Sequence, residues 1–498
     1  MQKVFDNPSQ IETLVKQKYG FPDFIMMENA ALAIKKLILQ LKSESQKPGT
    51  PAKCLILCGK GNNGGDGYAL ARLLMGNLEP VVFCLEPPAA AEAKTQYEMC
   101  KKLGVKFLSK PALTKALSDS KNPPAFIIDC LYGTGFKGDL TGDAAKIVTL
   151  ANQANSTRIA CDIPTALAFD AHYTVTMGEH KLTLFSDKAK QVCGKIIVAP
   201  LGIDKDIFEA TASPAAYLIE ANDCKLPLRK NKAAHKGNFG HTVVIVGEKS
   251  GAAIICATAA MNFGSGLTSL VQKPESNLSQ FQISPELMIS EPGKKKGMTI
   301  PKRTSCIVYG SGIEAVTEDD LYKIAEWFNS ADTAYPAAVF DAGVFGCPDF
   351  PRFLKAMDER PDARIVLTPH LLELTRFCKN LNLFPRLTVE VLAQDPQTKI
   401  KVGKKINKLF PNTTLVIKSA NTFIASKEKI FIVTDGTPSL AKGGSGDVLA
   451  GMTGALLSQF YSAQDAAITA CEAHALAATK HGAQSWDLSP MRLIKMMS

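Results

Sequence analysis

The chain has 498 residues, a formal net charge of +10 and 46% hydrophobic residues. This length exceeds one ordinary hydrophobic core, so two domains are expected, and 21% charged residues is typical of a globular rather than a disordered chain. The basic residues are scattered apart from runs at 225–236 and 294–296, and neither run contains aromatic residues, so we expect no nucleic-acid binding.

The N-terminal part alternates between helical and extended patterns. Residues 11–41 carry apolar side chains at helical spacing, and we expect one helix there. Short β-branched runs then alternate with helix-like segments, which favours a parallel, doubly wound sheet. The expected strands are 55–58, 81–85, 126–129, 158–162 and 195–199, with helices at 89–103 and 144–154.

A glycine-rich segment, Cys58–Gly67, follows the first strand of this pattern and precedes a helix-like run. We expect its glycines to adopt positive φ and to expose backbone N–H groups, so that an anion can approach the turn and the start of the helix. The side chains of Asn62, Asn63 and Asp66 add amide and carboxylate groups that can bind a sugar, a ring or a monovalent cation.

Two further motifs follow strand ends: Asp129–Gly138 follows the third strand, and Asp162–Ala166 follows the fourth. An acid at a strand end can simply cap a turn. The carboxyl ends of parallel strands meet at one edge, however, and ligands of such sheets bind there. We therefore expect these motifs and the glycine-rich segment to form a shared site.

The three motifs in this order resemble the YjeF N-terminal family of NAD(P)H-hydrate epimerases, and the resemblance covers residues 1–215. It implies a Rossmann-like domain that interconverts the R and S forms of the hydrated dinucleotides NADHX and NADPHX with a bound K⁺. It assigns Asp162 as the acid/base, and Asn63, Asp129 and Thr165 as K⁺ ligands. The implied substrate-binding residues are Asn62, Asn63, Gly64, Gly65, Asp66, Gly133, Thr134, Gly135, Phe136, Lys137, Gly138 and Asp162.

The chain departs from this family at Thr165-Ala166, where the family usually has Ser-Gly. Threonine keeps the hydroxyl group, so cation binding is preserved. Ala166 tolerates a positive φ less well than glycine.

The periodicity fades after residue 209, and we expect a linker at 216–228. A second α/β domain then covers 229–498. Its expected strands are 242–246, 267–271, 306–309, 339–341, 364–367, 414–418 and 430–433, with a helix at 252–263.

The chemistry of this second half concentrates at Leu440–Gly451, where small residues open a helix and Asp447 lies in its first turn. Free backbone N–H groups and the helix dipole favour an anion at this point. A carboxylate beside a phosphate site is well placed to take a proton from a hydroxyl that attacks a phosphoryl group, although a structural cap is the alternative.

The segment Gly443–Asp447 resembles the G-[AS]-G-D signature of ribokinase-like kinases. Together with His235-Lys236-Gly237, Thr368-Pro369-His370 and Lys418 it resembles the YjeF C-terminal family, the ADP- or ATP-dependent NAD(P)H-hydrate dehydratases. The resemblance implies a ribokinase-like α/β/α domain that uses Mg²⁺ and ADP (or ATP), with ADP favoured. It assigns Asp447 as the base and Ala252, Gly312, His370 and Asp447 as substrate contacts. The implied nucleotide-binding residues are Lys418, Ser419, Ala420, Asn421, Thr422, Thr437, Leu440, Ala441, Lys442, Gly443, Gly444, Ser445 and Gly446.

Several positions of this half differ from the family. Glu314 ends a loop that is glycine-rich in the family, Gly343 replaces an aspartate, and Ser419 replaces a glycine. His370 has a second interpretation, because a histidine after Thr-Pro can cap the following helix.

Three functions remain open. The first is a bifunctional repair enzyme, with an epimerase followed by a dehydratase. The second is a small-molecule kinase with an attached dinucleotide-binding domain, and the third is a dinucleotide-binding scaffold whose second site has decayed. We also expect a homo-oligomer, and the apolar segment 463–478 fits either a core helix or a subunit interface.

The thirteen cysteines form no C-x-x-C pair, and many lie within apolar runs, which is typical of free thiols in a reducing compartment. The N-terminus lacks an apolar signal core, and no apolar run reaches the ~18–20 residues that span a bilayer. We therefore expect a cytoplasmic protein without a membrane partner.

Overall fold

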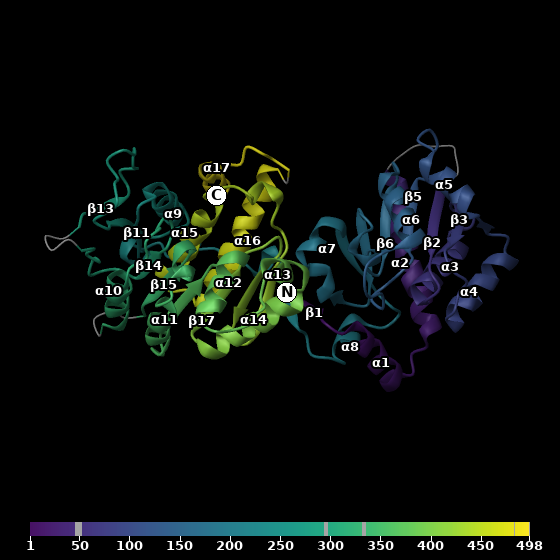
Figure 1. The fold of residues 1–498 in the computed structure, drawn as a ribbon, viewed down its shortest axis with the longest axis horizontal. Helices are drawn as coiled ribbons and strands as arrows, with labels where there is room; N and C mark the ends of the chain where they lie inside the picture. The colour runs from purple at the N-terminus through teal and green to yellow at the C-terminus, as the bar shows by residue number, and fades with distance from the viewer. Residues whose placement is uncertain (45–51, 293–296, 331–334, 483, 498) are drawn as a thin grey trace. The chain divides into compact units, whose positions relative to one another are not determined.

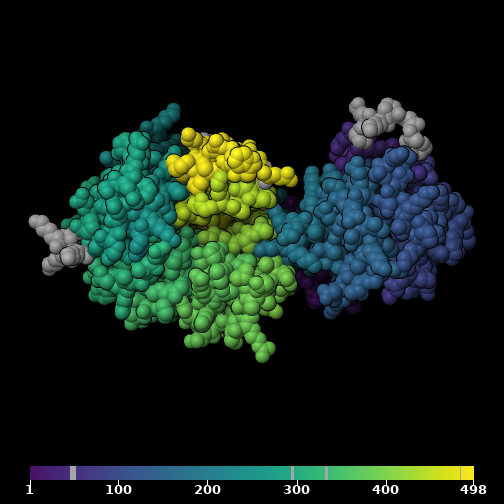
Figure 2. Space-filling model, turned by 45° about the horizontal axis from the view of Figure 1, so that its top comes forward, coloured from purple at the N-terminus to yellow at the C-terminus, as the bar shows by residue number. Residues whose placement is uncertain are grey.

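The computed structural model describes residues 1–44, 52–292, 297–330, 335–482 and 484–497, so the basic run at 294–296 lies outside the described residues. The chain divides into two compact units. We call residues 3–215 the N-terminal unit and residues 216–498, with residues 1–2, the C-terminal unit. Figure 2 shows the closely packed surface of each unit.

The N-terminal unit is built on a parallel sheet, as the sequence predicts (Figure 1). Its order reverses at the strand before the glycine-rich segment, so the loops after β2 and β5 flank a topological switch point, where ligands of such sheets bind. The strands lie in the order β4 (Lys106–Phe107), β3 (Glu79–Cys84), β2 (Lys53–Cys58), β5 (Phe126–Cys130), β6 (Thr157–Cys161), β7 (Tyr173–Met177) and β9 (Lys195–Ala199). A short parallel pair joins β1 (Gln2–Phe5) to β8 (His180–Lys181).

Helices cover both faces of this sheet. Along β2, Ile56 packs into a core with α2 and α3, whereas Leu55 and Leu57 pack into a second core with α5 and α6. This alternation confirms the doubly wound fold. The helices are α1 (Pro8–Tyr19), α2 (Asp23–Glu44), α3 (Asn62–Leu74), α4 (Ala91–Lys102), α5 (Lys110–Ser118), α6 (Gly142–Gln153), α7 (Asp187–Val192) and α8 (Lys205–Glu209).

The expectation of a single helix over 11–41 is wrong, because two helices occupy this region. Gly20 ends α1 with a left-handed φ of +67°. Pro22 follows immediately, and the residue before a proline is disfavoured in a helix.

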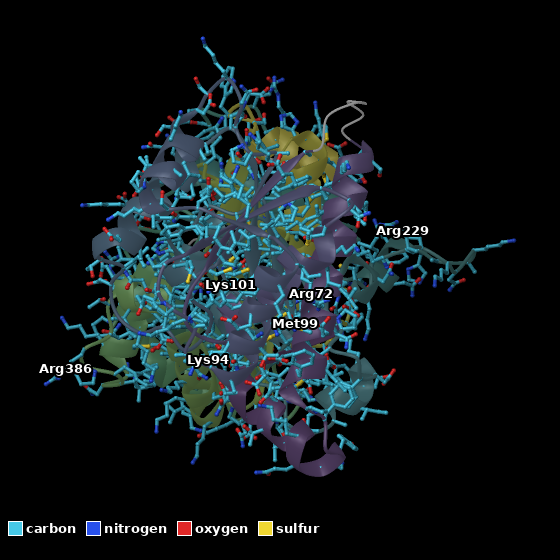
Figure 3. All side chains as sticks on the ribbon, turned by 90° about the vertical axis from the view of Figure 1, so that its right-hand side faces the viewer. Arg72, Lys94, Met99, Lys101, Arg229 and Arg386 are labelled. Atoms are coloured by element: carbon cyan, nitrogen blue, oxygen red, sulfur yellow. The ribbon has the colours of Figure 1, made fainter. Side chains whose placement is uncertain are left out.

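Arg72 joins three helices of the N-terminal unit. It lies on α3 (Figure 3). It donates hydrogen bonds to Glu28 of α2 and, over 3.3 Å, to Gln96 of α4. Gln96 in turn donates to Glu28 over 2.6 Å. These bonds tie the C-terminal part of α3 to its two neighbouring helices.

The C-terminal unit also has a mainly parallel sheet, in which β18 is antiparallel to both neighbours. Residues 216–218 were expected in the linker, but they form β10, which pairs in parallel with β19. The strands lie in the order β13 (Met288–Ser290), β12 (Leu267–Gln272), β11 (His241–Val246), β14 (Cys306–Tyr309), β15 (Ala337–Phe340), β16 (Arg364–Leu367), β17 (Thr413–Ile417), β18 (Thr422–Ser426), β19 (Lys429–Val433) and β10 (Ala216–Leu218).

The helices of this unit also cover both faces, so the second half is an α/β/α domain. One face packs against α9 (Ser250–Asn262), α15 (Ser445–Ser458) and α16 (Ala463–His481), and the segment 463–478 is therefore a core helix of the unit. A cluster of phenylalanines, including Phe340, Phe350 and Phe377, packs between the other face and its helices. The remaining helices are α10 (Glu318–Asn329), α11 (Phe350–Asp358), α12 (Leu371–Asn380), α13 (Val389–Gln394), α14 (Pro396–Leu409) and α17 (Pro490–Met496).

All thirteen cysteines are free thiols, as expected, and ten of them are buried. Among the described helices, none is long and apolar enough to cross a membrane.

The glycines of the segment 58–67 do not adopt positive φ, so that expectation is wrong. They are needed for close packing instead. A Cβ atom on Gly64 would lie 2.0 Å from the Gly59 carbonyl oxygen, and one on Gly67 would lie 2.7 Å from Cys58 Sγ. Gly61 is the exception, with no atom within 4 Å of its Cβ position.

Replacement of Gly67 by alanine should therefore destabilise the N-terminal unit by about 1–3 kcal/mol, because α3 must move off the sheet. Replacement of Gly61 by alanine, at the residue just before α3, should change stability by less than about 1 kcal/mol. Chemical denaturation of both variants measures the difference. Equal stability of the two variants would contradict the packing role of Gly67.

Two candidate active sites

The first candidate site lies at the switch point of the N-terminal sheet, where α3 begins and the loops after β5 and β6 end. No side chain caps the N-terminus of α3, and the Asn63 side chain in its first turn lies beside Gly133. A Cβ atom on Gly133 would lie 3.1 Å from Asp162 Oδ2 and 3.6 Å from Asn63 Cγ. The three predicted motifs therefore meet in one place.

Asp162 forms a buried ion pair that sequence reasoning missed. Its backbone has a φ of +70°, and its carboxylate accepts a hydrogen bond from Lys181 Nζ. Lys181 is only 1% exposed. Burial alone would lower the pKa of Lys181, but the negative charge of Asp162 raises it instead, so the lysine is an ammonium ion.

Lys181 follows β7, a strand that the sequence analysis did not predict. The alternation of Tyr173, Thr174, Val175 and Thr176 was the available signal, since it is typical of a strand that ends next to the site. Lys137, which the resemblance assigns to the substrate site, is by contrast exposed.

Asp129 and Thr165 are fully buried and hydrogen-bonded to each other. Asp129 accepts from the Thr165 backbone N–H over 2.8 Å and from its hydroxyl over 2.7 Å. The Leu131 N–H donates a third bond over 3.2 Å. Burial nevertheless raises the pKa of Asp129 to about 6, so a nearby cation would stabilise its charged form.

Asn63 is the remaining predicted cation ligand. Both polar atoms of its amide are shielded from solvent and have no hydrogen-bond partner among the described residues. A buried amide of this kind needs a partner. Carboxylate, hydroxyl and amide oxygens are suitable ligands for a hard monovalent cation, so this donor set fits K⁺.

The other predicted residues of this site have mixed positions. Gly65 packs against Met27 of α2, and Gly64 against Gly59, so both support the helix start. Phe136 stacks on Tyr132 with ring centroids 4.8 Å apart.

The last predicted residues of this site differ in exposure. Burial raises the pKa of Asp66. Asn62 and Gly135 are exposed, Thr134 is partly exposed, and Gly138 adopts a φ of +99°.

The second candidate site lies at the carboxyl ends of β14 to β17 in the C-terminal unit, beside the start of α15. Gly444 precedes α15 with a φ of +93°, and no side chain caps this helix. Asp447 lies in its first turn, and its pKa is raised to about 6, mainly by burial and also by the negative charge of Asp341. This is a carboxylate poised to gain and lose a proton near neutral pH.

A second buried ion pair lies next to Asp447. Lys418 Nζ donates to Asp341 Oδ1 over 2.7 Å, and the Thr368 hydroxyl donates to the same oxygen over 2.8 Å. Asp341 is 3% exposed. A Cβ atom on Gly446 would lie 3.4 Å from Lys418 Nζ, so the lysine lies against the glycine loop that opens α15.

His370 caps a helix. Its Nδ1 accepts from the Glu373 backbone N–H over 3.3 Å, while Glu373 accepts from the His370 backbone N–H over 2.8 Å. The imidazole is nevertheless 50% exposed on its side-chain surface, so capping leaves it accessible from the site edge.

Several of the remaining predicted residues of this site lie close to one another where their backbones approach. A Cβ atom on Gly312 would lie 2.9 Å from the Ala252 side chain, so these two residues are in contact. The segments 418–422 and 434–442 run side by side, because a Cβ atom on Gly436 would lie 3.8 Å from the Ala420 carbonyl oxygen. Lys442 donates to the Trp486 carbonyl oxygen over 3.2 Å, and Asn421 is buried at the start of β18.

Comparison with known proteins decides the family. Residues 242–498 match the model of the NAD(P)H-hydrate dehydratase family, and residues 23–183 match that of the YjeF-related protein N-terminus. The bifunctional NAD(P)H-hydrate repair enzyme Nnr of Helicobacter pylori is 35% identical over 99% of both chains. The chain belongs to the family of bifunctional NAD(P)H-hydrate repair enzymes.

The relative of the same name from Moorella thermoacetica is 28% identical over 90% of this chain and 86% of its own. Among solved structures, a ribokinase-like protein from Enterococcus faecalis is similar over 57% of this chain and 95% of its own, with 19% identity and a TM-score of 0.46.

The departures from the family pattern have local structural counterparts. Ala166 adopts a φ of +54°, the conformation that the family's glycine permits at no cost. Glu314, the carboxylate in the glycine loop, is exposed and forms an ion pair with Lys249 over 2.6 Å. Its charge is therefore offset before a phosphate approaches.

Replacement of Ala166 by glycine should stabilise the N-terminal unit by about 1 kcal/mol, because glycine removes the strain of the left-handed conformation. Replacement of Ala168 by glycine is the matched control. Ala168 has a φ of −122°, so that variant should be destabilised by about 0.5–1 kcal/mol. Urea denaturation of both proteins tests the prediction, and a destabilised Ala166→Gly variant would contradict it.

Proposed function

We propose that this chain repairs hydrated nicotinamide dinucleotides. The N-terminal unit interconverts the R and S forms of NADHX and NADPHX, and the C-terminal unit dehydrates the S form with ADP or ATP. The observation that carries this proposal is the presence, in one member of the repair family, of two separate sites with a carboxylate each. Asp162 lies at the switch point of the N-terminal sheet, and Asp447 lies in the first turn of α15. The likeness to the family's relatives extends over the full chain.

In the N-terminal unit, Asp162 would exchange the proton that inversion at C6 of the hydrated ring requires. The ammonium group of Lys181 donates a hydrogen bond to the Asp162 carboxylate and so holds it in place in the site. The N–H groups at the start of α3 would bind the phosphates.

A bound K⁺ would be held by Asn63, Asp129 and Thr165. Its positive charge would offset the buried Asp129 carboxylate, and it would orient the Asn63 amide that has no other partner among the described residues. We assign it an orienting role, since the proton-transferring group, Asp162, has its own cation in Lys181.

In the C-terminal unit, Asp447 would take the proton from the hydroxyl group of the hydrated ring while this oxygen attacks the terminal phosphoryl group. The N–H groups of Gly443–Gly446 and the ammonium group of Lys418 would bind the transferred phosphoryl group. The C–O bond then breaks and phosphate leaves with the bonding electrons. Loss of a proton from the neighbouring carbon restores the reduced nicotinamide ring. Mg²⁺ would offset the charge of the nucleotide phosphates.

The repair reaction can be followed by the return of the near-ultraviolet absorbance of reduced nicotinamide. We expect the unmodified enzyme, with K⁺, Mg²⁺ and ADP or ATP, to restore all of it from a mixture of R and S hydrates. Asp447→Asn should lower the dehydration rate by about 10²–10⁴-fold, because the general base is lost. The Asp162→Ala variant should convert the S fraction rapidly. It should convert the R fraction only at the rate of spontaneous epimerisation.

Each variant is the control for the other, since the two substitutions lie in different units. Epimerisation should persist in Asp447→Asn, and dehydration of pure S hydrate should persist in Asp162→Ala. Accumulation of a stable phosphorylated product would support the kinase alternative. Binding of the hydrate without turnover by the unmodified enzyme would support the scaffold alternative.

The K⁺ site predicts cation-dependent stability. K⁺ at about ten times its dissociation constant should raise the Tm of the N-terminal unit by about 3–6 °C relative to a tetramethylammonium salt of equal ionic strength. The Asn63→Ala variant should lose most of this shift, because it lacks the amide ligand. Differential scanning calorimetry gives the measurement, and an undiminished shift in the variant would exclude Asn63 as a ligand.

A further inference from the structure

A second carboxyl group of the N-terminal unit lies close to the Asp162–Lys181 pair. Glu179 lies between β7 and β8 and is 0% exposed. Neither of its carboxylate oxygens has a hydrogen-bond partner among the described residues. Its nearest cation is Lys181, whose Nζ lies 3.9 Å from Glu179 Oε1. A buried carboxyl group without a hydrogen-bond donor is costly to ionise.

Lys181 has no spare hydrogen bond to offer. An ammonium group has three donors. One is used by Asp162, one by the Thr176 hydroxyl over 3.2 Å, and one by the Met177 carbonyl oxygen over 3.0 Å. Lys181 can therefore bind Glu179 only by releasing one of these acceptors.

The acids around Glu179 raise its pKa, although one of them, Glu209, forms ion pairs with Lys3 and Lys205. Glu12 of α1, Asp162 and Glu209 of α8 all act on it with negative charge, whereas Lys181 is the cation that opposes its protonation. Burial is the largest cause of the shift, and together these effects raise the pKa of Glu179 to about 8. At neutral pH the group therefore carries its proton.

We infer that Glu179 is a positioning residue for the epimerase site, whose protonated form leaves Lys181 on Asp162 and whose ionised form draws Lys181 away. Ionisation places a full negative charge 3.9 Å from the ammonium group and makes Glu179 a competitor of Asp162. Asp162 then loses the hydrogen bond from Lys181 that positions its carboxylate, and the proton released by Glu179 passes to solvent. This inference rests on the proposed epimerase function of the unit.

The test is the pH profile of the epimerase rate, measured with substrate at saturation and far below KM. The unmodified enzyme should lose activity above about pH 8, because Glu179 ionises there. In Glu179→Gln the alkaline limb should move up by at least about one pH unit. Glu179→Leu, which also cannot ionise, should show the same profile and keeps the test available if the glutamine variant does not fold.

Glu472→Gln is the matched control. Glu472 is likewise 0% exposed, its pKa is also raised to about 8 by burial, and it lies in the C-terminal unit. This variant should leave the epimerase profile unchanged. An alkaline limb that stays in place in both Glu179 variants would overturn the inference.

A thermal measurement separates this inference from the proposed function, because it needs no activity. The folded state retains the Glu179 proton at a pH where the unfolded chain has lost it, so stability falls as pH rises from about 4.5 to about 8. The fall in Tm of the N-terminal unit between about pH 6 and pH 9 should be smaller in Glu179→Gln than in the unmodified protein. An unchanged Tm profile would overturn the assigned proton, whereas a changed profile without epimerase activity would refute only the proposed function.

Discussion

Parallel pairing of the central strands is the constraint on which both sites depend. In each unit the strands that carry the chemistry run in one direction, so the loops after them collect at one edge. The same pairing buries the strands on both faces, which removes water from the carboxylates at their ends. Burial raises the pKa of Asp129, in β5, and that of Asp447, in the first turn of α15, to about 6. The fold therefore brings the acids together and also tunes them.

Buried charge has to be compensated locally, and the two units use similar solutions. Asp162 is paired with Lys181, and Asp341 with Lys418. In each pair the lysine comes from another strand end, so the pair forms only when the sheet is complete. Removal of one partner would leave an isolated charge in a medium of low polarity, which is far more costly than loss of the whole pair. This coupling links the integrity of each site to the folding of its sheet.

The sequence predicted the two-unit α/β architecture, most strands and the motifs that converge at each site, because hydrophobic periodicity and strand-end polar residues are local signals. Two features were not predictable in this way, and a third was readable but missed. The close packing of Gly64 and Gly67 depends on the distance between α3 and the sheet. The burial of Lys181 depends on β7 and on acids from other elements. The break at Gly20 was readable from Gly20 and Pro22, but the strong apolar period on both sides obscured it.

The departures from the family in the C-terminal unit are structurally connected. Gly343 takes the place of the family's aspartate, and a Cβ atom there would lie 2.4 Å from the Ile313 carbonyl oxygen. Ile313 belongs to the altered loop at 310–314, so the loop and the glycine fit each other. Independent decay of the two positions would produce clashes or gaps, whereas the two changes here accommodate one another. Asp341, Lys418 and Asp447 remain close to one another beside the altered loop at 310–314. This arrangement favours a catalytic unit with an altered substrate surface over a decayed unit.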